Sequence, residues 1–112
     1  MEARAIIRYA RYSPQKMRRV VNGIRKNYSY SVADALSILK FKSSKGARLL
    51  EKVLNSAIAN AINKDMDGEA LKIKTISVDE GPPLKRMKPL SMGRATIIKK
   101  RTSHIKVVLT DE

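Results

Sequence analysis

The apolar residues among the first twelve positions alternate with their neighbours along the chain. Ala5, Ile7 and Tyr9 fall on one side of the alternation, and Ile6 and Arg8 fall on the other. A two-residue period is typical of a strand, because successive side chains of an extended backbone point to opposite faces. We therefore predict a short strand between residues 3 and 12.

A helix is predicted to follow directly. Ser13 is a suitable N-cap, and Pro14 suits the first helical position because it lacks a backbone N–H. Four apolar residues then recur at the spacing of a single helical stripe: Met17, Val20, Val21 and Ile24. The first turn contains no acid, and Lys16 stands where a capping box would place Glu. This charge opposes the helix dipole unless an anion outside the protein supplies the negative charge.

Two more helices are predicted in the middle of the chain. The second should begin at Ser31 with Asp34 as the acid of a capping box, and its apolar stripe comprises Val32, Ala35, Leu36 and Leu39. The third should run from about Ser44 to Asn63, and its broad apolar face comprises Ala47, Leu50, Val53, Leu54, Ala57, Ile58 and Ala61. Small residues in its second half allow a neighbouring element to approach closely, so we favour plain core packing for this stretch.

The C-terminal third predicts strands joined by a projecting segment. Leu71 and Ile73 alternate in one phase and Ile76 and Val78 in another, so we expect a bulge between them. Residues 81–94 hold three prolines and two glycines, which should deny the segment regular ladder hydrogen bonds. Strand character returns over residues 95–110. We predict a long β-hairpin over about residues 80–103, with arms that reach about 30 Å. Because an isolated two-stranded ribbon is only marginally stable in water, we expect a partner to order this hairpin.

The charge of the chain indicates what kind of partner it binds. It has 24 Lys and Arg against 10 Asp and Glu, which give a formal net charge of +14. Residues 1–28 carry +7, residues 29–82 carry +1 and residues 83–112 carry +6. Two basic blocks thus flank a nearly neutral middle. A plain solvated surface normally interleaves both signs. The excess indicates a polyanionic partner, either nucleic acid or an acidic membrane surface.

The sequence offers little for catalysis, metal binding or a membrane. It has no cysteine, and His104 is the only histidine. Ser103 and His104 are adjacent in a predicted strand, so they cannot form a nucleophile–base pair. Asp65, Asp67 and Glu69 resemble part of a calcium loop but lack its glycine and its terminal Glu. No apolar run approaches the ~18 residues that span a bilayer. We expect one soluble intracellular domain over residues 1–112, with no enzymatic activity and no cofactor.

Five segments of the chain carry a family resemblance when they are taken together and in order. They are SPQKMRRVV (residues 13–21), NSAIANA (55–61), VDEGPPLKR (78–86), GRA (93–95) and KRTSHI (100–105). With these segments the chain resembles large-subunit ribosomal protein twenty-two, in its compact bacterial or organellar form, over essentially its whole length. The combination of KRTSHI with SAIANA is specific, although each hexamer alone is modest support.

The resemblance implies an α+β fold of three helices on a three-stranded antiparallel sheet, with a long extended hairpin. It also implies a structural constituent of the large ribosomal subunit, on a cytoplasmic or organellar ribosome. Such a protein binds 23S-type rRNA and bridges its domains during assembly. Its globular part lies near the mouth of the peptide exit tunnel, and its hairpin lines the tunnel. The implied partners are rRNA, the nascent polypeptide and neighbouring ribosomal proteins, with no membrane and no homo-oligomer.

Candidate RNA-binding residues come from both basic blocks. In the first block they are Arg4, Arg8, Arg11, Ser13, Lys16, Arg18, Arg19 and Arg25. In the second they are Lys85, Arg86, Lys88, Arg94, Lys99, Lys100 and Arg101, to which the resemblance adds Ser103 and His104. For His104, a structural hydrogen bond within the sheet is an equal alternative. Tyr9 and Tyr12 are candidates for base stacking, but core or rim packing is favoured in a chain with 4% aromatic residues.

The resemblance places the hairpin tip against the tunnel: Met87, Lys88, Pro89, Leu90, Ser91 and Met92. Family members commonly carry a more basic segment after the proline, and Leu90 and Met92 stand here where positive charge is expected. Two rival functions remain. A free RNA chaperone or regulator would have a compact fold without a long unsupported hairpin. A peripheral membrane protein would present aromatic residues at the interface, but this chain has no Trp and one Phe.

Overall fold

The last strand of the chain lies at the centre of the sheet in the computed structural model, which describes residues 1–27 and 31–111, without the side chains of 25–27 and 69. The sheet is antiparallel with the order β1–β5–β2, formed by β1 (Glu2–Ala10), β5 (Ser103–Thr110) and β2 (Lys72–Glu80). Every second residue of β5 from Ser103 to Leu109 is buried, whereas the residues between them are half-buried. This strict alternation suits a strand that is paired along both edges and covered on one face.

Both outer strands change register against β5. The shift in β2 falls between Ile73 and Thr75, which confirms the bulge predicted from the change of phase. The shift in β1 falls between Ile7 and Ala10 and was not predicted. It brings Ala10 back to the buried side opposite Ser103.

The helices α1 (Pro14–Asn27), α2 (Val32–Phe41) and α3 (Lys45–Asn63) confirm the predicted positions to within a residue or two. All four residues of the α1 stripe are buried. Ser44 caps α3 by accepting from the Ala47 N–H at 3.2 Å. The capping box predicted for α2 is wrong in one respect, because the Ser31 side chain makes no capping hydrogen bond.

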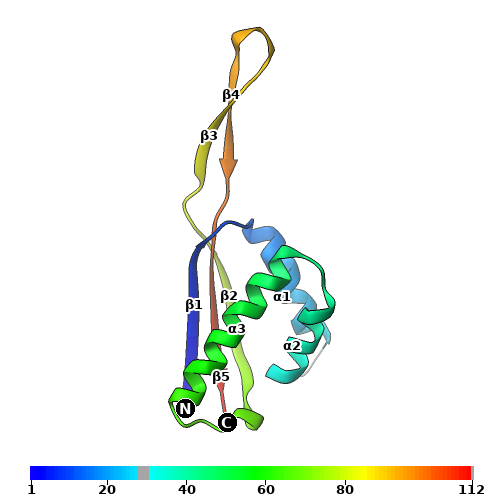
Figure 1. The fold of residues 1–112 in the computed structure, drawn as a ribbon, viewed down its shortest axis with the longest axis vertical. Helices are drawn as coiled ribbons and strands as arrows, with labels where there is room; N and C mark the ends of the chain where they lie inside the picture. Colours follow the sequence, from blue (N-terminus) through cyan, green and yellow to red (C-terminus); the bar gives the residue numbers. More distant parts are fainter. Residues whose placement is uncertain (28–30, 112) are drawn as a thin grey trace.

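Helix α3 crosses one face of the sheet, and the other two helices pack beside it (Figure 1). Ala57 and Ala61 are fully buried, and their small side chains let α3 approach β1 closely, as predicted. Two polar contacts secure this approach. Asn60 Nδ2 donates to the Arg4 carbonyl at 2.8 Å, and Lys64 Nζ donates to the Glu2 carbonyl at 2.9 Å.

Beyond the sheet, β3 (Leu84–Pro89) and β4 (Ala95–Lys100) form a two-stranded hairpin that projects away from the helices (Figure 1). Six residue pairs lie in unbroken register, from Leu84 opposite Lys100 to Pro89 opposite Ala95. The expectation that proline and glycine would prevent a regular ladder is therefore wrong. The prolines lie at or outside the ends of β3, where they interrupt no pairing between the other residues. The hairpin accounts for the long axis of the molecule, which extends 62 Å.

A polar neck joins the hairpin to the sheet. The region of residues 95–110, which was predicted to have strand character, is interrupted at this neck and forms two strands, β4 and β5. The Gly81 N–H donates to the Thr102 carbonyl at 3.0 Å, and Thr102 Oγ1 donates to the Pro82 carbonyl at 2.9 Å. Thr102 is buried. A Cβ on Gly81 would lie only 2.3 Å from Thr102 Oγ1, so this close approach of the two strands requires glycine.

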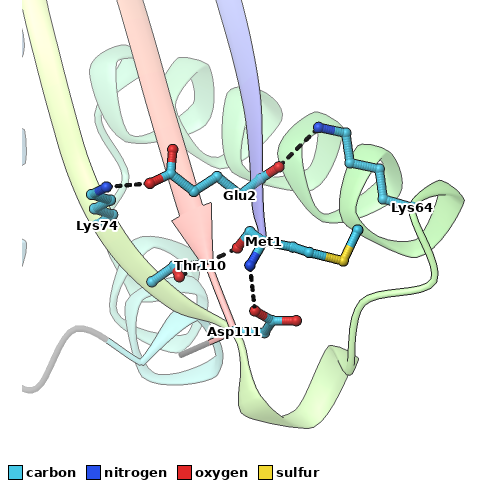
Figure 2. A network of polar contacts seen from close by, with 6 residues as sticks. All are labelled: Met1, Glu2, Lys64, Lys74, Thr110 and Asp111. Atoms are coloured by element: carbon cyan, nitrogen blue, oxygen red, sulfur yellow. Dashed lines mark hydrogen bonds and ion pairs between the residues drawn. The ribbon is translucent and has the colours of Figure 1, made fainter.

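At the end of the molecule opposite the hairpin, polar contacts join the first and last residues of the sheet (Figure 2). The Met1 amino group pairs with Asp111 at 3.2 Å, and Lys74 pairs with Glu2. The hydrogen bond and the charge of Lys74 lower the pKa of the Glu2 carboxyl. Because the folded-state pKa lies below the unfolded one, this contribution to stability is present above the unfolded pKa and is lost as pH falls through the folded pKa. The group is exposed, so its effect is small and screened by salt.

We predict that Gly46→Ala destabilises the protein. An added Cβ would lie 2.7 Å from Tyr12 Cε2 and 3.0 Å from Val20 Cγ2, inside the packing of α3 against α1. Overpacking typically costs about 1–3 kcal/mol, which exceeds the gain in helix propensity of at most about 1 kcal/mol. Thermal unfolding should show a melting temperature lower by several degrees. Gly68→Ala is the matched control, because nothing lies within 4 Å of its added Cβ. A rise in melting temperature for Gly46→Ala would contradict the packing argument.

Candidate nucleic-acid interface

The two basic blocks of the sequence meet at the base of the hairpin. There the chain leaves β1 for α1, and β4 returns to β5. A surface depression of about 600 Å³ lies at this junction. We call it the basic depression, and its lining residues are Arg11, Tyr12, Ser13, Lys16, Lys45, Lys99, Lys100 and Arg101. Six of these eight residues are basic and none is acidic.

The described residues of the protein do not neutralise the positive charges of the basic depression. Across residues 1–27 and 31–111, none of its six basic side chains takes part in an ion pair. Helix α1 begins beside the depression at Pro14 and has no acid in its first turn, so its dipole adds a partial positive charge there. This concentration of like charge is unfavourable unless a polyanion is bound.

Lys45 is a member of the depression that sequence reasoning missed. It is the first residue of α3, in the nearly neutral middle of the chain, so no local excess of charge marks it. Its Nζ donates to the Arg11 carbonyl at 3.3 Å, which links the start of α3 to the end of the first basic block. Only the packing of α3 across the sheet brings this lysine to the others.

Other predicted residues extend the basic surface away from the depression. Arg4 and Arg8 are exposed on β1; Arg4 lies between the buried Ala3 and Ala5, and Arg8 lies next to the exposed Tyr9. Lys85, Arg86, Lys88 and Arg94 are exposed along the hairpin. Lys85 stands directly opposite Lys99 in the ladder, and like charges across a strand pair are destabilising. The hairpin therefore presents a ribbon of positive charge that its own strands do not compensate.

Some predicted residues have internal partners. Ser103 is fully buried, and its hydroxyl donates to the Tyr12 carbonyl at 2.6 Å, so we leave it out of the proposed surface. His104 is half-buried, and its Nδ1 accepts from the Tyr9 N–H at 3.0 Å, which is the structural alternative named above. Arg18 is exposed, but it donates to the Val78 carbonyl at 3.1 Å and so links α1 to β2. Arg19 is exposed, and the side chain of Arg25 lies outside the described residues.

The tip of the hairpin is a tight turn closed by a hydrogen bond from the Leu90 N–H to the Arg94 carbonyl. Met92 and Gly93 both have positive φ, of 64° and 72°. All six predicted tip residues from Met87 to Met92 are exposed, including Met92 at 96% and Leu90 at 49%. The tip is thus a small apolar surface at the end of a basic ribbon.

The described part of the chain contains no cluster of three or more potential metal-ligating side chains. It also contains no helix long and apolar enough to cross a membrane. The surface is instead a basic depression, a basic ribbon and an apolar tip. This combination is the electrostatic footprint of a nucleic-acid-binding protein.

Comparison with known proteins agrees with this class. A model of the family described as ribosomal protein L22p/L17e matches residues 5–110. Curated relatives are named large ribosomal subunit protein uL22. The relative from Desulfitobacterium hafniense (strain DSM 10664 / DCB-2) is 54% identical over 112 residues, covering 99% of this chain and 96% of its own. That from Thermus thermophilus is 51% identical over 113 residues, covering 100% and 97%. That from Fusobacterium nucleatum is 50% identical over 113 residues, covering 100% and 99%.

The chain belongs to the ribosomal protein L22p/L17e family. This confirms the resemblance seen in the sequence and the prediction of a structural constituent of the large ribosomal subunit that is not an enzyme. The bacterial relatives also confirm the bacterial form and a place on the cytoplasmic ribosome.

We predict that Lys45→Ala weakens binding of RNA to the basic depression by a similar factor whatever the RNA sequence. Affinity of the wild type should fall by about 10³ between about 50 and 200 mM salt if six or more phosphates are contacted. Removal of one phosphate contact should make the slope of log affinity against log salt shallower by about one. Filter binding at several salt concentrations measures both quantities. Lys52→Ala, an exposed lysine on the same helix away from the depression, is the matched control and should keep the wild-type slope. Equal slopes for both variants would contradict the role of the depression.

Proposed function

We propose that this protein binds large-subunit rRNA as a rigid scaffold that holds separate RNA segments together. One observation carries the proposal: cations from both ends of the chain meet in the basic depression, at the base of an exposed hairpin, and form no ion pair with any of the residues that the structure describes. A surface of this kind gains most of its binding free energy from release of the counterions of RNA. The family relationship supports rRNA as the polyanion.

The geometry favours contacts to several RNA segments at once. The sheet and helices fix the depression, and the neck at Gly81 and Thr102 fixes the start of the hairpin. The hairpin then carries Lys85, Arg86 and Lys88 away from the globular part (Figure 1). Once bound RNA orders the hairpin, one rigid body spans RNA segments that are distant in sequence and bridges them during assembly. Recognition is mainly of backbone shape, because side chains cannot read the deep groove of an RNA helix.

The proposal extends to the peptide exit tunnel. The hairpin has almost no buried side chain, and only Leu84 and Ile98 are half-buried, so its order depends on surroundings outside this chain. We infer that rRNA encloses its basic strands and that Leu90 and Met92 face the nascent polypeptide. The globular part then lies near the tunnel mouth beside other ribosomal proteins, as a single copy.

The long hairpin also distinguishes this proposal from its rivals. A free RNA chaperone has no need of an unsupported ribbon whose paired lysines repel each other. A peripheral membrane protein requires an apolar face bordered by aromatic residues, whereas the exposed surface at the depression is basic.

We expect the hairpin to be dispensable for folding but necessary for lining the peptide exit tunnel. Leu84 and Lys100 are paired, so an Asn-Gly turn that replaces residues 85–99 should close a short hairpin. Shortening a loop changes its closure entropy by only about 1 kcal/mol. The variant should fold, bind rRNA more weakly and still enter large subunits, as measured by melting, filter binding and sedimentation.

Placement of the tip is tested on the full-length protein in ribosomes with a stalled nascent chain. A photoreactive residue at position 90 or 92 should cross-link to the nascent peptide, and the same probe at position 52 on α3 should not. Cross-links from position 52 alone would show that the hairpin does not point into the tunnel.

A further inference from the structure

The unpredicted bulge of β1 places a tyrosine where glycine is the usual residue. Ile7 pairs with Ile105 and Ala10 with Ser103, so β1 holds one residue more than β5 between these pairs. Tyr9 takes up the extra length with φ of +59°. This left-handed conformation is strained for a bulky side chain, and β-bulges that need it normally use glycine. A residue held there against its preference is a candidate for function.

Packing does not explain the tyrosine. Its side chain is 62% exposed, so the expectation of core or rim packing for Tyr9 is wrong, although Tyr12 packs against the core as expected. Tyr9 makes two contacts with one neighbour. Its N–H donates to His104 Nδ1 at 3.0 Å, and the two rings meet edge to face with centroids 4.9 Å apart at 89°. These contacts hold the ring in place while leaving most of it accessible.

The surroundings of the ring have the chemistry of a nucleotide site. A second depression, of about 270 Å³, lies beside it and is lined by Ile6, Arg8, Tyr9, Asp79, His104 and Lys106. Its volume is below the ~300 Å³ at which pockets for larger ligands begin, and suits one planar ring. Arg8 and Lys106 supply positive charge for a phosphate, and Asp79 supplies a hydrogen-bond acceptor.

We propose that Tyr9 is a stacking platform for one unpaired nucleobase of RNA. This inference rests on the proposed function and deepens it, because it adds contact with a base to a surface otherwise built for phosphates. Sequence-specific and single-strand RNA recognition depends on unstacked bases that lie on aromatic side chains. The bulge projects the ring, His104 orients it, and the flanking cations hold the backbone of the same nucleotide.

The test uses the full-length protein and two labelled RNA hexamers: oligoriboadenylate, and a hexamer with the same phosphates but no bases. Fluorescence anisotropy at constant salt measures the ratio of the two affinities. The wild type should prefer the oligoriboadenylate by about ten-fold, as expected for one stacked base. Tyr9→Phe keeps the ring and should keep this preference.

Tyr9→Gly is the decisive variant, because glycine adopts the observed φ without strain and removes only the ring. Its melting temperature should not fall, its affinity for the abasic hexamer should stay unchanged, and its preference for bases should disappear. Tyr9→Asn, which also tolerates this conformation, provides a second variant with the same expected result.

Each contrary outcome has a separate meaning. If the wild type binds both hexamers equally and with strong salt dependence, the stacking platform is overturned and the electrostatic function stands. If Tyr9→Gly keeps the preference for bases, stacking occurs elsewhere and the platform is again overturned. If Tyr9→Gly lowers the melting temperature and weakens binding of both hexamers alike, the role of Tyr9 is structural. Failure of the wild type to bind either hexamer would overturn the proposed function together with the platform.

Discussion

The fold depends on the central position of β5, which pairs with β1 along one edge and with β2 along the other. Ile105, Val107 and Leu109 on this strand are fully buried and form the floor on which α3 packs. Because β2 and β5 are neighbours, the residues between them must leave the sheet and return at the same place. That connection is the hairpin, and its position and direction are consequences of the sheet order.

Electrostatic repulsion limits what this fold does on its own. The core of helices and sheet is apolar and well packed, but the cations of both basic blocks are gathered where the hairpin leaves the sheet. Lys85 and Lys99 face each other in the ladder without a local counter-charge between them. A negatively charged partner relieves this repulsion, so the surface that is least favourable in the free protein is the one best suited to bind RNA. The apolar core of the globular part thus stabilises the fold, whereas binding depends on the basic depression and the hairpin that leaves beside it.

Local patterns in the sequence determined a large part of this protein. Helical spacing located α1, α2 and α3, and the change of phase located the bulge in β2. The hairpin was also predicted, although its Pro and Gly residues were wrongly expected to prevent a regular ladder. These features are predictable because they depend on neighbouring residues, whose periodicity, caps and backbone preferences act within a few positions. The net charge and its division into two blocks are also properties of the sequence alone.

Tertiary structure decided which residues share a surface. Lys45 reaches the basic depression only because α3 packs across the sheet, and Ser103 is removed from the surface because β5 turns it into the core. Tyr9 is exposed because one extra residue in β1 must be accommodated against β5. The positions of Ser103 and Tyr9 depend on the register between β1 and β5, whose contacting residues Tyr9 and His104 are 95 positions apart in the sequence. A shift of one residue in that register moves a side chain to the other face of the sheet. Sequence periodicity cannot predict this register, because it reflects the preferences of each segment alone and not the pairing of one segment with another.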